Sequence, residues 1–441
     1  MMKKHFLLLC LCMAAVGTHA ARVIDGINYE LDRDALLAVV VALDNPDKYS
    51  GDITIPKTVK VGDYEFTVVG VEKRAFAGCK ITSVSFPGTL RYINNEAFYN
   101  CSQLTSISLP DSITGIGAEA FAGCSKVKSL KLPDNEVTVL YNAFSYMRSL
   151  TELVIPDKWT SIGYIHEDGE EYGERVFEEC TSLRKVVIGK GVKSICREAF
   201  SNCGELSEVV CSEEGSLEYI SSNVFEYTAL TSMRFLPHTL KKMRESVFMG
   251  CSMAEIFIPS SLEVYYGGQN HSADAELKSL VLEDSPNPIQ CLVTDGWFTE
   301  VYLGRAISAN MPFRVNRNSK NIKKVTFGPY FRGGNEWSFG YGVEEIYSKV
   351  TDPSVITCTF TDQVYDNATL YVPVGTKAAY AAQSNFKKFF DIREYEPSGI
   401  NATERSYRTT VSNHYYDLNG RRTNRPQKGI YIVNGTKVVV K

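Results

Sequence analysis

A short segment recurs along this chain at a nearly fixed spacing. It combines an Ala-Phe pair, a cysteine three residues after the Phe, and an apolar strand that ends before a proline. Ala97-Phe98 with Cys101, followed by Leu104 to Pro110, is one example. One such unit cannot bury its own apolar face, whereas a stack of units can. The repeat therefore predicts a solenoid in which each unit packs on its neighbours.

The strand half of the repeat has apolar residues at its first, fourth and sixth positions. Successive copies begin 23 or 24 residues apart in eight of eleven steps, and one longer step of 33 residues contains an insertion. This regularity favours stacked coils of equal size. The twelve copies begin at Ile81, Leu104, Val127, Leu150, Leu183, Leu206, Leu230, Met253, Leu277, Phe298, Ile322 and Val343.

The Ala-Phe half of the repeat is present in eight copies and fades after Phe248. We expect each Phe to fill the coil interior and the small residue before it to allow a short helical turn. Six cysteines occupy one repeat position, where two further copies have Met147 and Thr228, so the position is interpreted as a buried packing slot. Stacked strands lie about 4.8 Å apart, within the Cα range of a disulfide, but a mostly reduced ladder is the favoured interpretation. The cysteines are Cys79, Cys101, Cys124, Cys180, Cys203 and Cys251.

The N-terminus has the pattern of a secretory signal. Lys3 and Lys4 precede an apolar run from Phe6 to Val16, which is too short to span a bilayer, and Ala20 ends a small-residue cleavage pattern. We therefore predict a signal peptide at residues 1–20 and a secreted or cell-surface protein. The alternative is an uncleaved membrane anchor.

The remaining chain divides into four parts. Residues 21–70 lack the Ala-Phe signature and are predicted to form an N-terminal β cap. Residues 71–348 carry the repeats, which become degenerate after about residue 260. Residues 349–396 are expected to form a closing repeat and cap. Residues 397–441 are expected to form a linker and a small β tail, in which Asn434-Gly435 is a strong hairpin signal.

No catalytic or metal-binding motif is found in the sequence. The histidines are far apart, and the acidic insertion at residues 165–174 lacks the ligand spacing of a calcium loop, so a solvated loop is favoured there. The formal net charge of -4 provides no basic surface for nucleic acid. We predict no catalysis and no cofactor or metal. The histidines of the mature chain are His166, His238, His271 and His414.

The third and fifth strand positions are expected to point away from the core. In early copies they are small and polar, as in Ser106 and Ser108, whereas later copies have aromatic residues beside carboxylates. Exposed aromatic residues beside charges are typical of binding hot spots. The alternative is that these aromatic residues pack under irregular loops. The candidate binding residues are Glu255, Phe257, Val281, Glu300, Tyr302, Glu345 and Tyr347.

The unit Ala-Phe…Cys…Leu…Ile…Leu-Pro resembles the leucine-rich repeats of BspA-like bacterial surface proteins. The resemblance covers Val69–Ile258 strongly and Leu277–Glu396 loosely. It implies a curved right-handed leucine-rich repeat solenoid, of mostly β or α/β class, with a parallel sheet on the concave side and β-rich caps. It also implies adhesion and protein binding at bacterial surfaces. The stretch Gly429–Lys441 resembles the C-terminal sorting signals of type IX secretion.

These observations predict an exported, non-enzymatic repeat protein that binds protein or glycan on host or bacterial surfaces. We expect it to have no nucleic-acid partner and no transmembrane segment, and to be a monomer. A glycan-binding surface module is the first alternative, with Tyr302 beside Glu300 as its best local candidate. A secreted enzyme is the second alternative.

Overall fold

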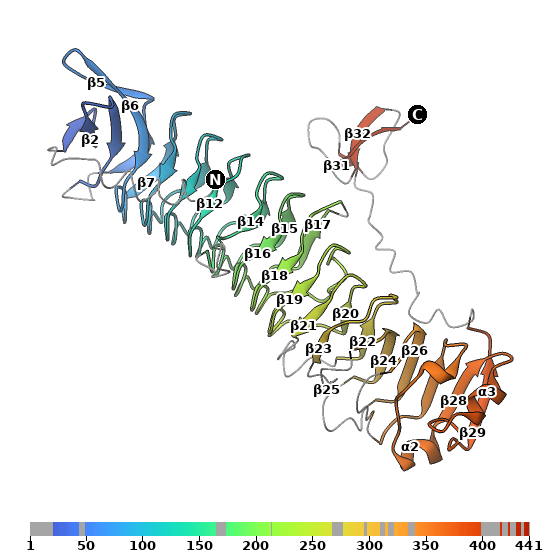
Figure 1. Ribbon diagram of the computed structural model, residues 1–441. Helices are drawn as coiled ribbons and strands as arrows, with labels where there is room; N and C mark the ends of the chain where they lie inside the picture. Colours follow the sequence, from blue (N-terminus) through green and yellow to red (C-terminus); the bar gives the residue numbers. More distant parts are fainter. Residues whose placement is uncertain are drawn as a thin grey trace.

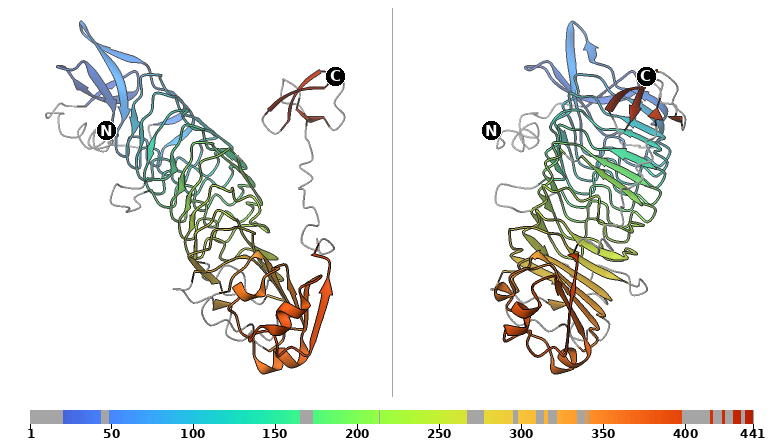
Figure 2. Two further views of the ribbon diagram at one scale, coloured as in Figure 1. Left: turned by 45° about the vertical axis from the view of Figure 1, so that its right-hand side comes forward. Right: turned by 90° about the vertical axis from the view of Figure 1, so that its right-hand side faces the viewer.

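The predicted solenoid is confirmed in the computed structural model, where coils stack one after another along a single axis (Figures 1 and 2). Most coils have three sides, which we call the first strand row, the second strand row and the turn row. The structure describes residues 21–43, 49–164, 173–212, 214–266, 277–294, 298–308, 314–315, 322–333, 339, 341–397, 415–416, 422–423, 429–433 and 436–440.

The first strand row is formed by the predicted apolar strands. Most neighbouring strands pair in parallel, and equivalent repeat positions face each other, as Ser106 faces Ser129 and Glu152 faces Lys185. The second of these pairs spans the 33-residue step, so the insertion leaves the register unchanged. The row comprises β4 (Ser50–Thr54), β7 (Lys80–Ser85), β9 (Ser106–Ser108), β11 (Ser129–Lys131), β13 (Glu152–Val154), β15 (Lys185–Ile188), β17 (Glu208–Cys211), β20 (Glu255–Ile258), β22 (Ser279–Leu282), β24 (Glu300–Arg305), β26 (Lys324–Tyr330), β27 (Glu345–Ser348), β28 (Thr369–Pro373) and β29 (Asp391–Tyr395).

One predicted member of this row is not a strand. The copy that begins at Leu230 keeps its fourth residue, Met233, buried, but no strand forms there. The Ser232 hydroxyl accepts a hydrogen bond from the Arg234 N–H, and the Leu236 N–H bonds to the Met233 carbonyl. These local bonds replace the ladder to the next coil. The row is therefore interrupted between β17 and β20.

The second strand row consists of shorter strands on the opposite wall, where the sequence places pairs such as Gly115-Ile116. The row comprises β8 (Tyr92–Ile93), β10 (Gly115–Ile116), β12 (Thr138–Val139), β14 (Ser161–Ile162), β16 (Ser194–Ile195), β18 (Tyr219–Ile220), β19 (Lys242–Met243), β21 (Val264–Tyr266), β23 (Cys291–Thr294) and β25 (Arg314–Val315). From β8 to β23 each strand buries at least one apolar side chain, and most neighbouring strands of the row pair in parallel.

The turn row contains the Ala-Phe segments, which form consecutive tight turns. The Ala97 N–H bonds to the Asn94 carbonyl in its own coil, whereas the Phe98 N–H bonds to the Ala120 carbonyl of the next coil. The residues two before and two after each Phe have positive φ, and these reversals prevent a continuous helix. The first set is Arg74, Glu96, Glu119, Asn142, Arg175, Glu198, Asn223 and Ser246, and the second is Gly78, Asn100, Gly123, Tyr146, Glu179, Asn202, Tyr227 and Gly250.

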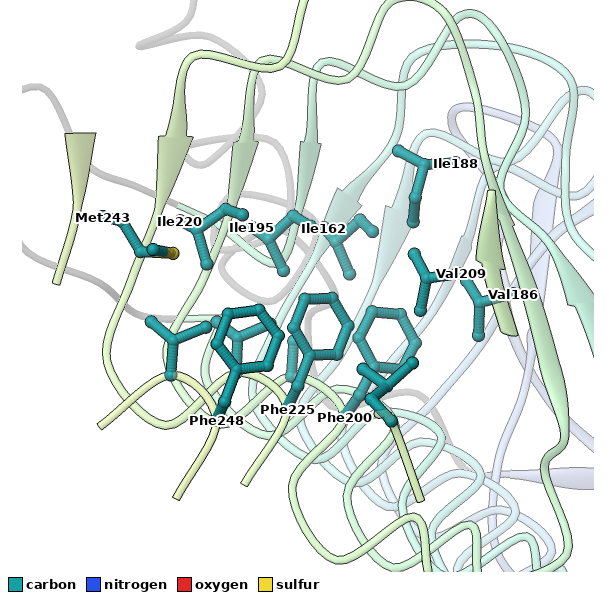
Figure 3. Close-up of a cluster of buried hydrophobic side chains, with 14 of the residues drawn as sticks. Ile162, Val186, Ile188, Ile195, Phe200, Val209, Ile220, Phe225, Met243 and Phe248 are labelled. Atoms are coloured by element: carbon teal, nitrogen blue, oxygen red, sulfur yellow. The ribbon is translucent and has the colours of Figure 1, made fainter. Parts of the chain in front are cut away.

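The eight Phe rings form one stack along the solenoid interior. Adjacent rings lie 5.0–5.8 Å apart between centroids and are inclined by 4–16°. Figure 3 shows Phe200, Phe225 and Phe248 beneath the second-row side chains Ile195 and Ile220. All eight rings are fully buried, as the repeat predicts. They are Phe76, Phe98, Phe121, Phe144, Phe177, Phe200, Phe225 and Phe248.

Beyond Phe248 the buried side chain of Arg305 provides a different link between coils. Its guanidinium donates to the carbonyls of Pro259, Ser260 and Leu262 at 2.7–3.0 Å. Burial lowers the pKa of Arg305 to about 10, which leaves the group charged at neutral pH. Three carbonyl partners compensate for the desolvation of this charge. Arg305 therefore joins two coils in the region where the Ala-Phe pattern is lost.

Both ends of the stack continue the strand rows. At the N-terminal end, β4 pairs with β7, and β6 pairs with β8. The other N-terminal strands are β1 (Arg22–Ile24), β2 (Ile27–Asp32), β3 (Leu37–Val40), β5 (Thr58–Val61) and β6 (Tyr64–Val71). At the C-terminal end, short helices accompany β28 and β29 (Figure 1), namely η2 (Pro353–Val355), α2 (Asp362–Asn367) and α3 (Lys377–Ala382).

The tail forms a separate four-stranded sheet. Strands β32 and β33 pair antiparallel on either side of Asn434-Gly435, as the sequence predicts. The strands are β30 (Tyr415–Tyr416), β31 (Arg422–Thr423), β32 (Gly429–Val433) and β33 (Thr436–Val440). The predicted signal peptide and most of the acidic insertion lie outside the described residues, as do His166, His271 and His414.

Candidate functional site

The strands from β20 to β29 present two rows of outward side chains, which we call the strand face. Their parallel register places equivalent positions side by side across seven strands. The candidate residues fall in two lines, with the carboxylates in one and the apolar and aromatic residues in the other. The first line is Glu255, Ser279, Glu300, Lys324, Glu345, Thr369 and Asp391, and the second is Phe257, Val281, Tyr302, Thr326, Tyr347, Tyr371 and Arg393.

Two of the candidates are less exposed than the sequence predicts. Phe257 is 8% exposed and Val281 is 7% exposed, although both occupy outward positions. The Arg234 guanidinium lies over the Phe257 ring, 4.5 Å from its centroid, and bonds to both oxygens of Glu255. The interrupted coil thus supplies an arginine that covers this part of the strand face. The expectation that Phe257 and Val281 are exposed was wrong.

Tyr302 is half-buried and held in one position by its neighbours. Its hydroxyl donates to Asp284 Oδ1 at 2.7 Å, and the Lys349 ammonium lies 5.1 Å from the ring centroid. A Cβ at Gly328 would lie 2.9 Å from the Tyr302 hydroxyl oxygen, so the glycine makes room for the ring. Asp284 just beyond β22, Gly328 in β26 and Lys349 just beyond β27 thus fix the orientation of Tyr302 before any partner binds.

Tyr347 belongs to an aromatic group at the C-terminal end of the strand face. Its ring stacks on Tyr371 with 4.4 Å between centroids and meets Tyr395 edge-on at 5.5 Å. The Lys324 ammonium lies 5.1 Å from the same ring. Burial, with Glu345 close by, raises the pKa of Tyr347 to about 12, so its hydroxyl is protonated at neutral pH. The stacked face of the Tyr347 ring is occupied by Tyr371, so the group presents mainly ring edges to a partner.

The carboxylates of the strand face differ in how they are neutralised. Glu255 forms an ion pair with Arg234 at 2.8 Å, whereas Glu300 is exposed and forms no ion pair within the described residues. Lys324 lies between Glu300 and Glu345 in the same line. Charges of both signs therefore surround the aromatic residues, and Glu300 is the carboxylate available to a partner.

Tyr371 is a part of the strand face that the repeat pattern missed. It occupies the same register position as Tyr302 and Tyr347. The pattern missed it because Asn367, which ends α2, stands where the first apolar strand residue would be. The alternation of Leu370 and Val372, both buried, is the signal that identifies the strand.

His238 is the histidine in the described residues that contacts both a hydroxyl and a carboxylate. Its Nδ1 lies 3.3 Å from the Ser260 hydroxyl and 3.5 Å from Glu283 Oε2. A proton relay needs the serine and the carboxylate on opposite ring nitrogens. Here both meet the same nitrogen, and Glu283 also accepts the Ser260 N–H at 2.6 Å. This arrangement caps a turn and lacks the geometry of a catalytic triad.

The described part of the chain lacks both a metal-binding cluster and a membrane-spanning helix. It contains no group of three or more His, Cys, Asp or Glu side chains placed to hold a metal ion. It also contains no helix with the length and apolar character needed to cross a membrane.

Comparison with known proteins identifies the type of repeat. Residues 69–166 and 164–268 match the family model of the "BspA type Leucine rich repeat region (6 copies)". The two matches together span the coils that carry all eight Phe residues of the stack. The sequence of these coils is therefore similar to BspA-type leucine-rich repeats, in agreement with the resemblance seen in the sequence. Comparison with curated proteins gives no match.

Several solved structures are similar to this chain. A leucine-rich repeat protein from Bacteroides ovatus is 20% identical, covers 85% of this chain and 100% of its own, and has a TM-score of 0.46. The leucine-rich repeat protein of T. pallidum is 24% identical, covers 50% and 92%, and has a TM-score of 0.38. A leucine rich cell surface protein from Faecalibacterium prausnitzii is 18% identical, covers 88% and 98%, and has a TM-score of 0.37.

Proposed function

We propose that this protein is an exported or cell-surface leucine-rich repeat protein that binds another protein through the strand face. Leucine-rich repeats of this type are consistent with a protein-interaction module. The observation that carries the proposal is the set of fixed, half-buried tyrosines beside an unpaired carboxylate. Tyr302, Tyr347 and Tyr371 stand in one line across the sheet, with Glu300 in the adjacent line.

Preorganised aromatic side chains support protein binding for a physical reason. A partner that contacts Tyr302 or Tyr347 meets a ring whose conformation is already restricted, so little side-chain entropy is lost on binding. Tyrosines with polar tips and apolar bodies are enriched at interface hot spots. The charges of Lys324 and Glu300 provide complementarity and orientation. Adhesion to host or bacterial surface proteins follows from this surface if the chain is exported.

The glycan alternative loses support at the strand face. A sugar ring stacks on a bare aromatic face, but one face of Tyr302 is approached by Lys349 and Tyr347 stacks on Tyr371. Neither ring is a free flat platform. We therefore assign the strand face to a protein partner and make polysaccharide binding an outcome of the test.

Export is proposed from the N-terminal pattern, with cleavage after Ala20. Surface sorting through a type IX route is proposed from the β tail, where β32 and β33 form the last hairpin. Both proposals are tested by expressing the full chain in a bacterium with that secretion route. Mass spectrometry of the exported protein should give a mature N-terminus at Ala21. Retention of residues 1–20, or export that survives removal of residues 429–441, would contradict the respective proposal.

The binding test begins with a screen of extracellular matrix proteins and polysaccharides against the purified mature chain. The partner's affinity is then measured for Glu300→Arg and for Glu152→Arg. Both glutamates are exposed and occupy the same repeat position, but Glu152 lies in β13, outside the strand face. We expect Glu300→Arg to weaken binding at least about tenfold, which corresponds to about 1.4 kcal/mol, and Glu152→Arg to leave it unchanged.

Charge reversal at Glu300 tests binding with less effect on stability than the removal of a tyrosine. Tyr302 and Tyr347 are packed against neighbouring side chains, so their loss would change stability as well as binding. Equal effects of the two arginine variants would contradict the assignment of the strand face. Binding to polysaccharide alone would overturn the protein-binding proposal.

A further inference from the structure

The turn row contains a groove that lies outside the strand face. It has a cavity volume of about 530 Å³, within the range of roughly 300–1,000 Å³ typical of ligand pockets. Tyr99, Glu119 and Tyr146 are among its lining residues, and they come from three successive coils. The groove therefore belongs to the repeat surface and not to one irregular loop.

The groove arises from a difference in size between equivalent positions. The middle coil has Ala122-Gly123, whereas the coils before and after it have Tyr99-Asn100 and Ser145-Tyr146. Backbone hydrogen bonds between neighbouring coils align the three segments. The Asn100 N–H donates to the Ala122 carbonyl, and the Gly123 N–H donates to the Ser145 carbonyl. Because coils lie about 4.8 Å apart, the small residues Ala122 and Gly123 leave a gap, as wide as one coil, between Tyr99 and Tyr146.

Polar groups in this groove are not satisfied by the protein. The Asn142 Oδ1 atom is buried and has no hydrogen-bond partner. The half-buried Glu119 carboxylate forms no ion pair or side-chain hydrogen bond with the described residues, and the same is true of the Tyr99 hydroxyl. The Glu119 carboxylate and the Tyr99 hydroxyl are therefore free to hydrogen-bond to a ligand.

We propose that this groove binds a neutral sugar unit of a polysaccharide or glycoconjugate. Its unpaired acceptors, the Glu119 carboxylate and the Tyr99 hydroxyl oxygen, call for a ligand rich in hydroxyl donors. The Tyr99 ring has no aromatic or cationic partner among the described residues and can accept the apolar face of a sugar ring. The uncompensated Glu119 carboxylate disfavours acidic sugars by charge repulsion.

The opposite wall of the groove can bind the same kind of ligand. The Arg148 guanidinium lies 5.7 Å from the Tyr146 ring centroid and 3.9 Å from Glu179. It provides hydrogen-bond donors for ring or glycosidic oxygens of a sugar. A peptide would satisfy some of these groups, but it does not offer the dense set of hydroxyl donors that two unpaired acceptors require. The sugar is therefore the favoured occupant.

Titration calorimetry of the mature chain with methyl glycosides of glucose, galactose, mannose and N-acetylglucosamine tests the proposal. We expect at least one to bind with a Kd of about 1 mM or tighter. Tyr99→Ala and Glu119→Gln should each weaken binding at least about tenfold. Tyr99→Ala introduces the residue that Ala77 and Ala122 provide at the same repeat position, so the fold should accept it.

The matched control is Tyr227→Asn. Tyr227 is an exposed tyrosine in the same turn position as Tyr146 but lies outside the groove, and Asn100 and Asn202 show that Asn fits the left-handed backbone there. The control should bind the sugar like the unmodified chain. The proposal is overturned if none of the four glycosides binds, if the control loses as much affinity as Tyr99→Ala, or if methyl glucuronide binds as tightly as the neutral sugars. It is also overturned if the groove variants impair a protein partner alone.

Discussion

The thiol of Cys101 donates a hydrogen bond to the backbone carbonyl of Phe76 in the preceding coil, with 3.0 Å between sulfur and oxygen. The relationship repeats through the stack. Four further cysteines of this repeat position bond to the Phe carbonyl one coil earlier, at 3.2–3.5 Å for three of them and 3.1 Å for Cys251, as Cys124 does with Phe98. None of the ten cysteines from Cys79 to Cys358 forms a disulfide. The cysteine position therefore has a polar role between coils in addition to filling space.

This bond makes the replacement of Cys101 sensitive to hydrogen bonding. We expect Cys101→Ala to lower the free energy of unfolding by about 1–3 kcal/mol, because it leaves a cavity and removes one donor to the Phe76 carbonyl. Cys101→Thr should cost less than Cys101→Ala, because Thr keeps most of the volume and its hydroxyl can be satisfied within its own coil, as Thr228 donates to the Phe225 carbonyl at 2.9 Å. Urea unfolding measures both. Equal losses would show that the filled volume contributes nothing and that the bond to the Phe76 carbonyl accounts for the effect.

Burial of these thiols gives the protein a distinct alkaline pH dependence. Burial raises the pKa of Cys124 to about 12, whereas an unfolded cysteine titrates near about 8.5. The unfolded chain loses this proton first, so the stabilisation is complete below about pH 8.5 and falls by roughly 1.4 kcal/mol per pH unit above it. Under reducing conditions Cys124→Ala should flatten the measured slope by that amount. An unchanged slope would contradict the buried, neutral thiol.

The Phe stack should respond strongly to loss of a ring in its middle. Phe121 contacts Phe98 at 5.0 Å and Phe144 at 5.6 Å between centroids. Phe121→Ala should lower the free energy of unfolding by about 3–5 kcal/mol. Phe121→Leu should cost less, because it keeps most of the volume and loses the ring contacts, worth about 0.5–1.5 kcal/mol each. A loss below about 1 kcal/mol for alanine would mean that the stack does not support the solenoid.

Substitutions at two glycines of the turn row, Gly78 and Gly123, distinguish the cost of backbone strain from the cost of a steric clash. Gly78 has φ +73° with open space at its Cβ position, so Gly78→Ala should cost about 1–2 kcal/mol from the left-handed conformation alone. Gly123 has φ +76°, and an added Cβ would collide with Asn100 Oδ1. Gly123→Ala should therefore cost more, and the added Asn100→Gly substitution, which removes the colliding side chain and accepts the positive φ of position 100, should remove the excess. Thermal unfolding of the three variants provides the comparison.

The periodic part of the fold could be predicted from the sequence because the same repeat positions are buried in every coil. The positions of Phe98, Leu104 and Ile107 follow from spacing alone, and all three are buried. The left-handed residues were not predicted, since Glu119, Asn142 and Tyr146 share no side-chain property that marks positive φ. The thiol bond was missed for a similar reason, because a carbonyl one coil away has no local sequence signal.

The candidate site was predicted only in outline. The alternation of the strands placed Glu300 and Tyr302 on one surface, but side chains from distant positions decide which residues are accessible. Arg234 covers Phe257, and Asp284 with Lys349 holds Tyr302. Such contacts form where an interrupted coil and the ends of two strands come together. The spacing of the repeats gives no information about these contacts.

The assignment of the strand face is tested most directly by lysine acetylation of the free protein and of its complex with a protein partner from the screen. Lys324 is on the strand face, and Lys349 lies over Tyr302. Lys131 holds an outward position in β11, outside the strand face. Mass spectrometry should show the partner protecting Lys324 and Lys349 while Lys131 remains reactive. Protection of Lys131 with unchanged labelling of Lys324 and Lys349 would contradict the account.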